Sequence, residues 1–166
     1  MLGETSDEGE FLAWHDGLPD VARAALAGAA ADWADDTAAE SQIRAALAVA
    51  PGHLAVRVGA YKFYFYKHRL PEAAPHALWC VGWASARLGL PADWRRLSAA
   101  AVAGAGPEPL LRFLLFSLKA YGYVMVRQGA LAEGRAAVAR VVDLDPDDRV
   151  GAGRLLTVID RGGVVD

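Results

Sequence analysis

The sequence predicts an all-α fold built from helices that pack in antiparallel pairs, and three observations support this. First, the 166 residues are 54% hydrophobic and 22% charged, which is typical of one globular domain of ordinary size. Second, alanine is very abundant, and alanine costs least in a helix interior. Third, prolines and glycines separate helix-patterned segments, with no clear strand signals between them. Short breaks between helices favour a stack of hairpins.

The N-terminal residues 1–9 are polar and acidic, so we expect a flexible terminus ahead of a single domain over residues 10–162. A short capping helix is expected to begin at three apolar residues: Phe11, Leu12 and Trp14. Pro19 suits the start of the next helix, because its missing N–H is not needed in a first turn. We expect that helix to run from Val21 to about Ala31.

A Pro-Gly break separates the next two predicted helices. Asp35 and Asp36 offer N-caps for the first of them, which should end at Pro51-Gly52. The second should run from about Leu54 to Lys67 and include an aromatic run that begins at Tyr61. Aromatic runs also favour strands. We predict a helix here, since no partner strand is evident.

Proline and glycine also delimit the C-terminal half. Pro71 opens a helix that fades near Gly89, a short helix should begin near Pro91, and residues 103–107 are the best loop signal. The remaining helices are expected at about 109–128, 131–143 and 148–160.

The segment from Leu115 to Asp148 carries a repeat pattern of apolar, small and helix-breaking residues. They are Leu118, Tyr121, Gly122, Met125, Gly129, Gly134, Val138, Val141 and Pro146. Their spacing resembles the tetratricopeptide repeat (TPR), a 34-residue helix–turn–helix unit. The resemblance implies a right-handed stack of about three TPR-like helical hairpins with a C-terminal capping helix. In such a unit Gly122 would let the two helices approach closely.

Earlier copies of the pattern are weaker. Ile43 to Pro51 has the same spacing as Val138 to Pro146. In the middle copy Tyr61 stands where the family has a small residue, unless a shift of one residue places Ala60 there, and His68 replaces the turn glycine. The expected units are repeats at about 20–53, 54–87 and 115–148, an insertion at about 88–107 and a capping helix at about 149–161.

Charge and cysteine content narrow the class of protein. The net charge is −3 with no basic block, so we expect no nucleic-acid partner. Cys80 is the single cysteine, which rules out an internal disulfide. The acidic N-terminus lacks a secretory pattern, and the apolar stretches look too short or too rich in Ala and Gly to cross a bilayer. We therefore expect a cytoplasmic protein without a membrane partner. Its Ala- and Arg-rich composition suits a bacterium.

No catalytic constellation is evident, so we expect a protein that is not an enzyme and that needs no cofactor or metal. His76 and Cys80 share a helix face, but a second ligand pair is missing, and we interpret Cys80 as a core residue. Residues 143–148 begin like a calcium loop but lack its glycine and glutamate. We interpret them as a turn followed by a helix N-cap.

The resemblance also implies a binding surface. In the TPR family the first helices of the hairpins line a concave groove that holds a peptide or a partner helix. Carried over by position, the groove residues are Lys62, Phe65, Tyr66, Lys119, Tyr123 and Arg127. Aromatic and basic groups together suit a ligand with apolar anchors and a carboxylate. We therefore predict an adaptor or chaperone for a protein or peptide partner, with a homodimer as a further expectation.

A second hypothesis remains open. The aromatic cluster and the insertion would enclose a small apolar ligand, making the chain a sensor or carrier domain. In that case three tryptophans should converge on one closed pocket: Trp79, Trp83 and Trp94.

Overall fold

A computed structural model describes residues 15–163 of the chain, and every regular element in that range is helical. The all-α prediction is confirmed for this part of the chain. The flexible terminus predicted for residues 1–9, and the short helix predicted to begin at Phe11, Leu12 and Trp14, lie outside the described residues.

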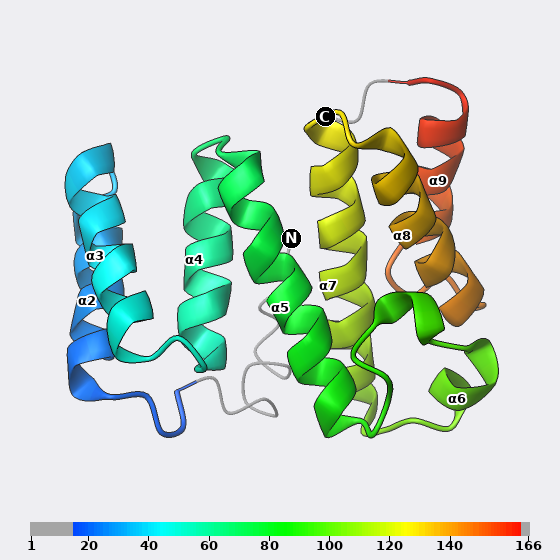
Figure 1. Cartoon of the computed structure of the whole chain (residues 1–166), viewed down its shortest axis with the longest axis horizontal. Helices are drawn as coiled ribbons and strands as arrows, with labels where there is room; N and C mark the ends of the chain where they lie inside the picture. Colours follow the sequence, from blue (N-terminus) through cyan, green and yellow to red (C-terminus); the bar gives the residue numbers. More distant parts are fainter. Residues whose placement is uncertain (1–14, 164–166) are drawn as a thin grey trace.

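Three helical hairpins lie side by side along the longest axis of the molecule, and a final helix packs on the last hairpin (Figure 1). The hairpins are α2 (Asp20–Ala31) with α3 (Asp36–Val49), α4 (Leu54–Tyr66) with α5 (Leu70–Arg87), and α7 (Glu108–Arg127) with α8 (Leu131–Leu144). The final helix is α9 (Ala152–Asp160). A 3-10 turn (Trp94–Arg96) and the short helix α6 (Ala99–Ala103) lie between the second and third hairpins. Each hairpin also contacts the next, through α3 with α4 and α5 with α7.

Local sequence signals explain most helix boundaries. The Asp35 carboxylate accepts the Ala38 N–H at 3.0 Å and so caps α3 as predicted. The aromatic run forms the end of α4, which confirms the helical prediction. The last helix begins at Ala152 rather than near Asp148, because Asp148 and Gly151 have φ of 52° and 70°, which interrupts the helix. The Asp148 carboxylate accepts the Gly153 N–H at 3.2 Å, as expected for a turn followed by a cap.

A pair of glycines sets the closest approach within the third hairpin. A Cβ atom on Gly134 would lie 2.6 Å from the Gly122 carbonyl oxygen and 2.7 Å from the Val126 backbone nitrogen. A Cβ on Gly122 would lie 2.7 Å from Cγ2 of Val138. Only a residue without a side chain fits at this crossing. The small-residue role predicted for Gly122 is therefore confirmed, and Gly134 shares it.

The second hairpin repeats the turn of the third. Helix α7 ends 61 residues after α4 ends, and α8 starts 61 residues after α5 starts. This offset aligns His68 with Gly129, and both have positive φ, 58° and 93° respectively. It also aligns Tyr61 with Gly122, so the alternative register with Ala60 is not needed at this turn. Tyr61 is nevertheless buried, opposite a helix whose Ala73 and Ala77 are fully buried.

The first hairpin packs against α4 mainly through small side chains, most of them alanines. Its core cluster joins Leu18, Ala22, Ala25 and Ala46 to Ala55 and Val56 of α4. A Cβ on Gly59 of α4 would lie 3.0 Å from Cδ2 of Leu26 on α2, which places these two helices in direct contact.

The insertion is part of the core. Trp94 is only 3% exposed, and its ring lies 6.4 Å from that of Tyr121 on α7. Arg95 pairs with Glu133 of α8, and the Arg140 guanidinium donates to the Leu97 carbonyl at 3.3 Å. The short helix α6, which the sequence signals did not predict, also contacts α8.

Helix α7 is longer than the repeat pattern requires. It begins at Glu108, as predicted for a helix from about 109, and by length and composition alone it could cross a membrane. This corrects the expectation that no apolar stretch is long enough. However, 67% of its apolar window is buried inside the molecule, as in the core helix of a folded domain.

Candidate functional site

The first helices of successive hairpins contact each other, α2 with α4 and α4 with α7. Gly59 of α4 meets Leu26 of α2, and Phe65 of α4 meets Tyr123 of α7 at a ring distance of 6.0 Å. We call the surface formed by α2, α4 and α7 the first-helix surface. All six predicted groove residues lie on two of these helices, α4 and α7: Lys62, Phe65, Tyr66, Lys119, Tyr123 and Arg127.

An aromatic cluster fills the junction between α4 and α7. Phe65 lies 5.3 Å from Tyr66 in an edge-on arrangement and 5.5 Å from Tyr61 in a stacked one. Tyr123 completes the cluster, and its hydroxyl accepts a hydrogen bond of 2.9 Å from the Arg127 guanidinium, which also lies 5.6 Å from the ring. Tyr66 is 52% exposed and Arg127 is exposed, so the cluster opens to solvent at this end.

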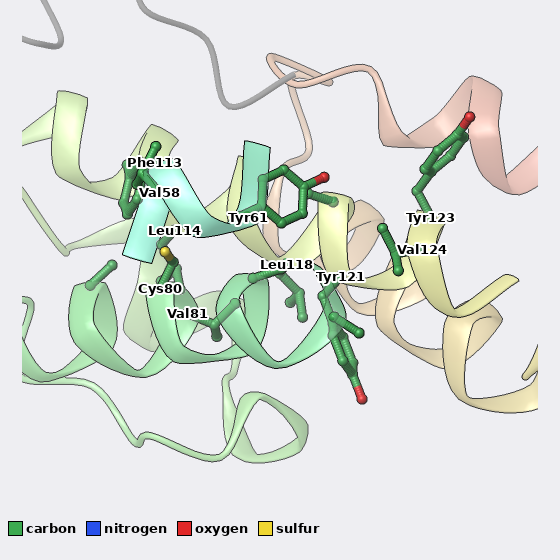
Figure 2. Packing of buried hydrophobic residues seen from close by; sticks show 14 of the residues in the cluster. Val58, Tyr61, Cys80, Val81, Phe113, Leu114, Leu118, Tyr121, Tyr123 and Val124 are labelled. Atoms are coloured by element: carbon green, nitrogen blue, oxygen red, sulfur yellow. The ribbon is translucent and has the colours of Figure 1, made fainter. Parts of the chain in front are cut away.

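Tyr61 lies beneath the exposed members of this cluster. It is 1% exposed, and its hydroxyl has no hydrogen-bond partner among the residues that the structure describes. Burial raises the pKa of this phenol, so it stays protonated and able to donate. Figure 2 shows its hydroxyl on the same side of α7 as that of Tyr123, while the Tyr121 hydroxyl points the opposite way. The unpaired phenol is a buried polar group near the opening of the cluster.

A second feature of the first-helix surface is an apolar pocket between α2 and α4. Its volume is about 200 Å³, and it is open on one side. The lining residues are Leu26, Ala29, Ala30, Trp33, Ile43, Gly59, Lys62 and Phe63. The Trp33 and Phe63 rings meet edge to face at 5.9 Å, and Lys62 brings a cationic side chain to an otherwise apolar lining.

The sequence analysis missed this pocket. Its lining comes from two hairpins and one connecting turn, and only Lys62 belongs to the predicted groove set. Gly59 was the available signal, because a glycine inside an apolar helix often marks a close helix contact.

Lys119 precedes Tyr123 by four residues on α7, so it shares a helix face with Tyr123 and Arg127. Its amine donates to the Val150 carbonyl at 2.7 Å, in the connection that leads to α9. Burial lowers the pKa of this amine, which shows that its side chain is partly removed from water. The structure thus shows Lys119 as a tie between α7 and the start of the capping helix, and its place in the groove stays a prediction.

The aromatic run of α4 also faces the second helices of the hairpins. The Tyr64 hydroxyl donates to Glu40 of α3 at 3.1 Å, and Arg69 pairs with the same carboxylate. Hydrogen bonds, that from Arg69 above all, lower the pKa of Glu40 to about 2. His76 also stacks on the Tyr64 ring, with the two ring centroids 5.9 Å apart. Burial and the nearby Arg57 guanidinium lower the pKa of His76 to about 4, so its imidazole is neutral at physiological pH.

The three tryptophans proposed to line a closed pocket occupy separate places. Trp79 lies under the Arg57 guanidinium, Trp83 packs against Phe113 and Arg87, and Trp94 packs against Tyr121. None of them lines the pocket between α2 and α4.

The two residues considered as metal ligands, His76 and Cys80, lie in different surroundings. Cys80 is completely buried, as predicted for a core residue, and its thiol pKa is raised by burial to about 12. His76 is held by Tyr64 and by a 3.4 Å contact with the Arg57 guanidinium. Within residues 15–163 no three His, Cys, Asp or Glu side chains gather in a way that could hold a metal ion.

Comparison with known proteins identifies the family of this chain by one relative. No protein-family model matches the chain, and no solved structure matches it. A protein of Azotobacter chroococcum mcd 1, described as an uncharacterized 19.8 kDa protein in the nifW 5′ region, is 43% identical over 133 residues. The match covers 79% of this chain and 74% of that protein. The chain therefore belongs to the same family as this Azotobacter protein.

Proposed function

We propose that this chain is a protein-interaction module, an adaptor or chaperone that holds a peptide or partner segment along the first-helix surface. The observation that carries the proposal is the exposed end of the aromatic cluster between α4 and α7, where Tyr66 and Arg127 meet solvent beside Tyr123. Tyrosine and arginine are enriched among the residues that dominate binding energy at protein interfaces. A guanidinium beside aromatic rings suits a partner carboxylate next to an apolar side chain.

The pocket between α2 and α4 supports the same proposal. Usual small-molecule sites measure about 300–1,000 Å³, and a cavity of about 200 Å³ that opens to the surface is closer to the size of one apolar side chain. Lys62 lines this pocket, and the next turn of α4 carries Tyr66. A partner segment lying along α4 would therefore place an apolar anchor in the pocket and an acidic group near Lys62 or Arg127.

We further propose that the three hairpins form a TPR-like right-handed stack. Three features support this: the Gly122–Gly134 crossing, the shared turn at His68 and Gly129, and the contacts of α4 with Leu26 of α2 and Tyr123 of α7. In such stacks each hairpin buries its faces against its neighbours and leaves a continuous surface for a ligand.

Affinity capture from a native lysate tests the binding proposal. The protein is compared with a Lys62→Glu/Arg127→Glu variant, and with Arg154→Glu/Arg161→Glu on the capping helix as the matched control. A partner retained by the wild type and the control, and lost by a groove variant that melts at the wild-type temperature, is the expected result. Equal capture by all three proteins would rule out this surface. Because the relative is described as lying in the nifW 5′ region, the nifW product is the first protein to look for.

The apolar pocket between α2 and α4 also supports a second candidate function, the binding of a small apolar ligand. If the chain carries a small apolar molecule, native mass spectrometry should show a bound species that is lost on Ala30→Phe. This substitution fills the pocket from an exposed lining position and so spares the core. Such a result, without a captured partner, would replace the adaptor proposal.

A further inference from the structure

The Tyr61 hydroxyl is a buried hydrogen-bond donor without an acceptor. Its side chain is 1% exposed, and it has no hydrogen-bond partner among the residues that the structure describes. By contrast, the Tyr64 hydroxyl donates to Glu40 at 3.1 Å, and the Tyr121 hydroxyl donates to Glu133 at 2.9 Å. An unpaired buried polar group lowers stability, and nearly all such groups in folded proteins have a partner. The Tyr61 phenol therefore needs an explanation that packing alone does not supply.

Further donors gather at the same junction of α4 and α7. The Tyr123 hydroxyl accepts a hydrogen bond of 2.9 Å from Arg127, so its own proton remains to be donated. The Arg127 guanidinium contacts this hydroxyl and its ring, and no carboxylate within residues 15–163 pairs with it. Figure 2 shows the Tyr61 and Tyr123 hydroxyls on the same side of α7. The junction thus holds several donors and lacks an anionic acceptor.

The side chains beside this phenol include two that meet solvent. The Tyr66 ring is 52% exposed, and Arg127 is exposed as well. Phe65 links the exposed and buried rings, because it contacts Tyr66 at 5.3 Å and Tyr61 at 5.5 Å. Burial raises the pKa of Tyr61, and the phenols of Tyr66 and Tyr123 raise it further, so both lie close to it. Interface side chains commonly change rotamer on binding while the backbone moves little.

We propose that Tyr61 is a specificity-determining donor of the first-helix surface, with a carboxylate of the partner as its acceptor. On binding, the Tyr66 and Arg127 side chains shift, and the carboxylate reaches the hydroxyls of Tyr61 and Tyr123 and the guanidinium. The apolar group next to the carboxylate packs on Phe65. The inference rests on the proposed function, because it names the chemical group by which the partner is recognised there. A segment without this acceptor leaves the buried donor unpaired and is therefore rejected.

Tyr61→Phe tests whether the hydroxyl is unpaired in the free protein. The substitution removes one oxygen atom and keeps the ring, so the melting temperature should be unchanged or higher. Tyr64→Phe, three residues further along α4, loses the hydrogen bond to Glu40 and should melt at a lower temperature. A Tyr61→Phe chain that melts below the wild type would overturn the inference, since the hydroxyl would then have a partner inside the protein.

NMR titration of the full chain tests the acceptor. The probe is N-acetylphenylalanine, whose carboxylate lies next to an apolar ring, and its uncharged carboxamide is the matched control. The acid should shift the backbone N–H signals of Tyr66, Tyr123 and Arg127 and bind about tenfold more tightly than the carboxamide. Tyr61→Phe should weaken acid binding about tenfold, as expected for the loss of a hydrogen bond to a charged group. Tyr64→Phe should bind the acid as the wild type does.

The outcomes separate this inference from the proposed function. Equal affinity of the acid for the wild type and Tyr61→Phe, or no shift at the junction, overturns the inference even if partner capture still depends on Arg127. Acid binding that requires Tyr61, without any captured partner, overturns the proposed function and leaves a carboxylate site at the junction. If both hold, Tyr61→Phe captures less partner than Tyr64→Phe, and equal capture by the two overturns the role of Tyr61 in recognition.

Discussion

At the scale of single residues, two glycines fix the spacing of the third hairpin. Gly134→Ala would force its new methyl group to within 2.6 Å of the Gly122 carbonyl, against backbone that cannot rotate away. We expect the free energy of unfolding to fall by about 1–3 kcal/mol or more, as for other overpacked sites, measured by urea denaturation. Gly82→Ala is the matched control, since its Cβ meets nothing within 4 Å. It should raise stability by about 0.5–1 kcal/mol through helix propensity. Equal effects at the two sites would contradict the close crossing.

Glu40 gives the protein an acid-sensitive contact. Its pKa is lowered from 4.5 to about 2, chiefly by the hydrogen bond from Arg69. A lowered folded-state pKa contributes stability that is fully present above the unfolded value and is lost as pH falls toward 2. Glu40→Gln should therefore reduce the loss of stability between pH 4.5 and pH 2, measured by denaturation at a series of pH values. Tyr64→Phe removes one donor and keeps the carboxylate, so it should retain most of that pH dependence. An unchanged acid limb in Glu40→Gln would show that this carboxylate does not control it.

At the scale of elements, three consecutive aromatic residues of helix α4 contact three different helices. Phe63 lines the pocket beside α2, Tyr64 bonds to Glu40 of α3, and Phe65 reaches Tyr123 of α7. Successive helix positions are turned by about 100°, so a run of aromatics must serve several neighbours. The sequence showed that these rings could not share one face. It did not show which neighbour each ring would contact, since those neighbours come from other hairpins.

The insertion between α5 and α7 is the element whose role changes most once the structure is known. Because Trp94 is buried against Tyr121, Trp94→Ala should lower the free energy of unfolding by about 3–5 kcal/mol, as for other large aromatic truncations. Hydrogen exchange should then speed up in residues 88–107 and in α8, which packs on the insertion. Arg96→Ala, an exposed neighbour, is the control. Faster exchange confined to residues 88–107 would mean that the insertion does not support the hairpin.

At the scale of the whole molecule, stability should decrease toward the N-terminal hairpin. Helix α5 packs on both α4 and α7, whereas the α2–α3 hairpin is held largely by alanines and reaches the rest through α4. Small side chains bury little apolar area, so this end should open at a lower free energy. Native-state hydrogen exchange should show less protection in α2 and α3 than in α5 and α7. Equal protection throughout would indicate one cooperative unit instead of a stack.

The sequence by itself determined the helices and their ends. Proline, glycine and capping residues act through the backbone within a few positions, so α2 to α5, α7 and α8 begin and end within a few residues of their predicted bounds. The start of α9 and the presence of α6 escaped prediction, because a turn at Asp148 and packing against α8 decided them. The hydrogen bond from Lys119 to the Val150 carbonyl also escaped prediction, because it depends on a loop 31 residues away.

Only the tertiary structure decided which residues form the candidate site. The pocket joins α2, α3 and α4, and the aromatic cluster joins α4 and α7, so neither exists within one helix or one hairpin. Helical periodicity states which side chains share a face, but not what lies opposite that face. The physical reason is that secondary structure is set by short-range backbone constraints. A binding surface, by contrast, is set by which side chains from distant segments are brought together and which remain exposed to solvent.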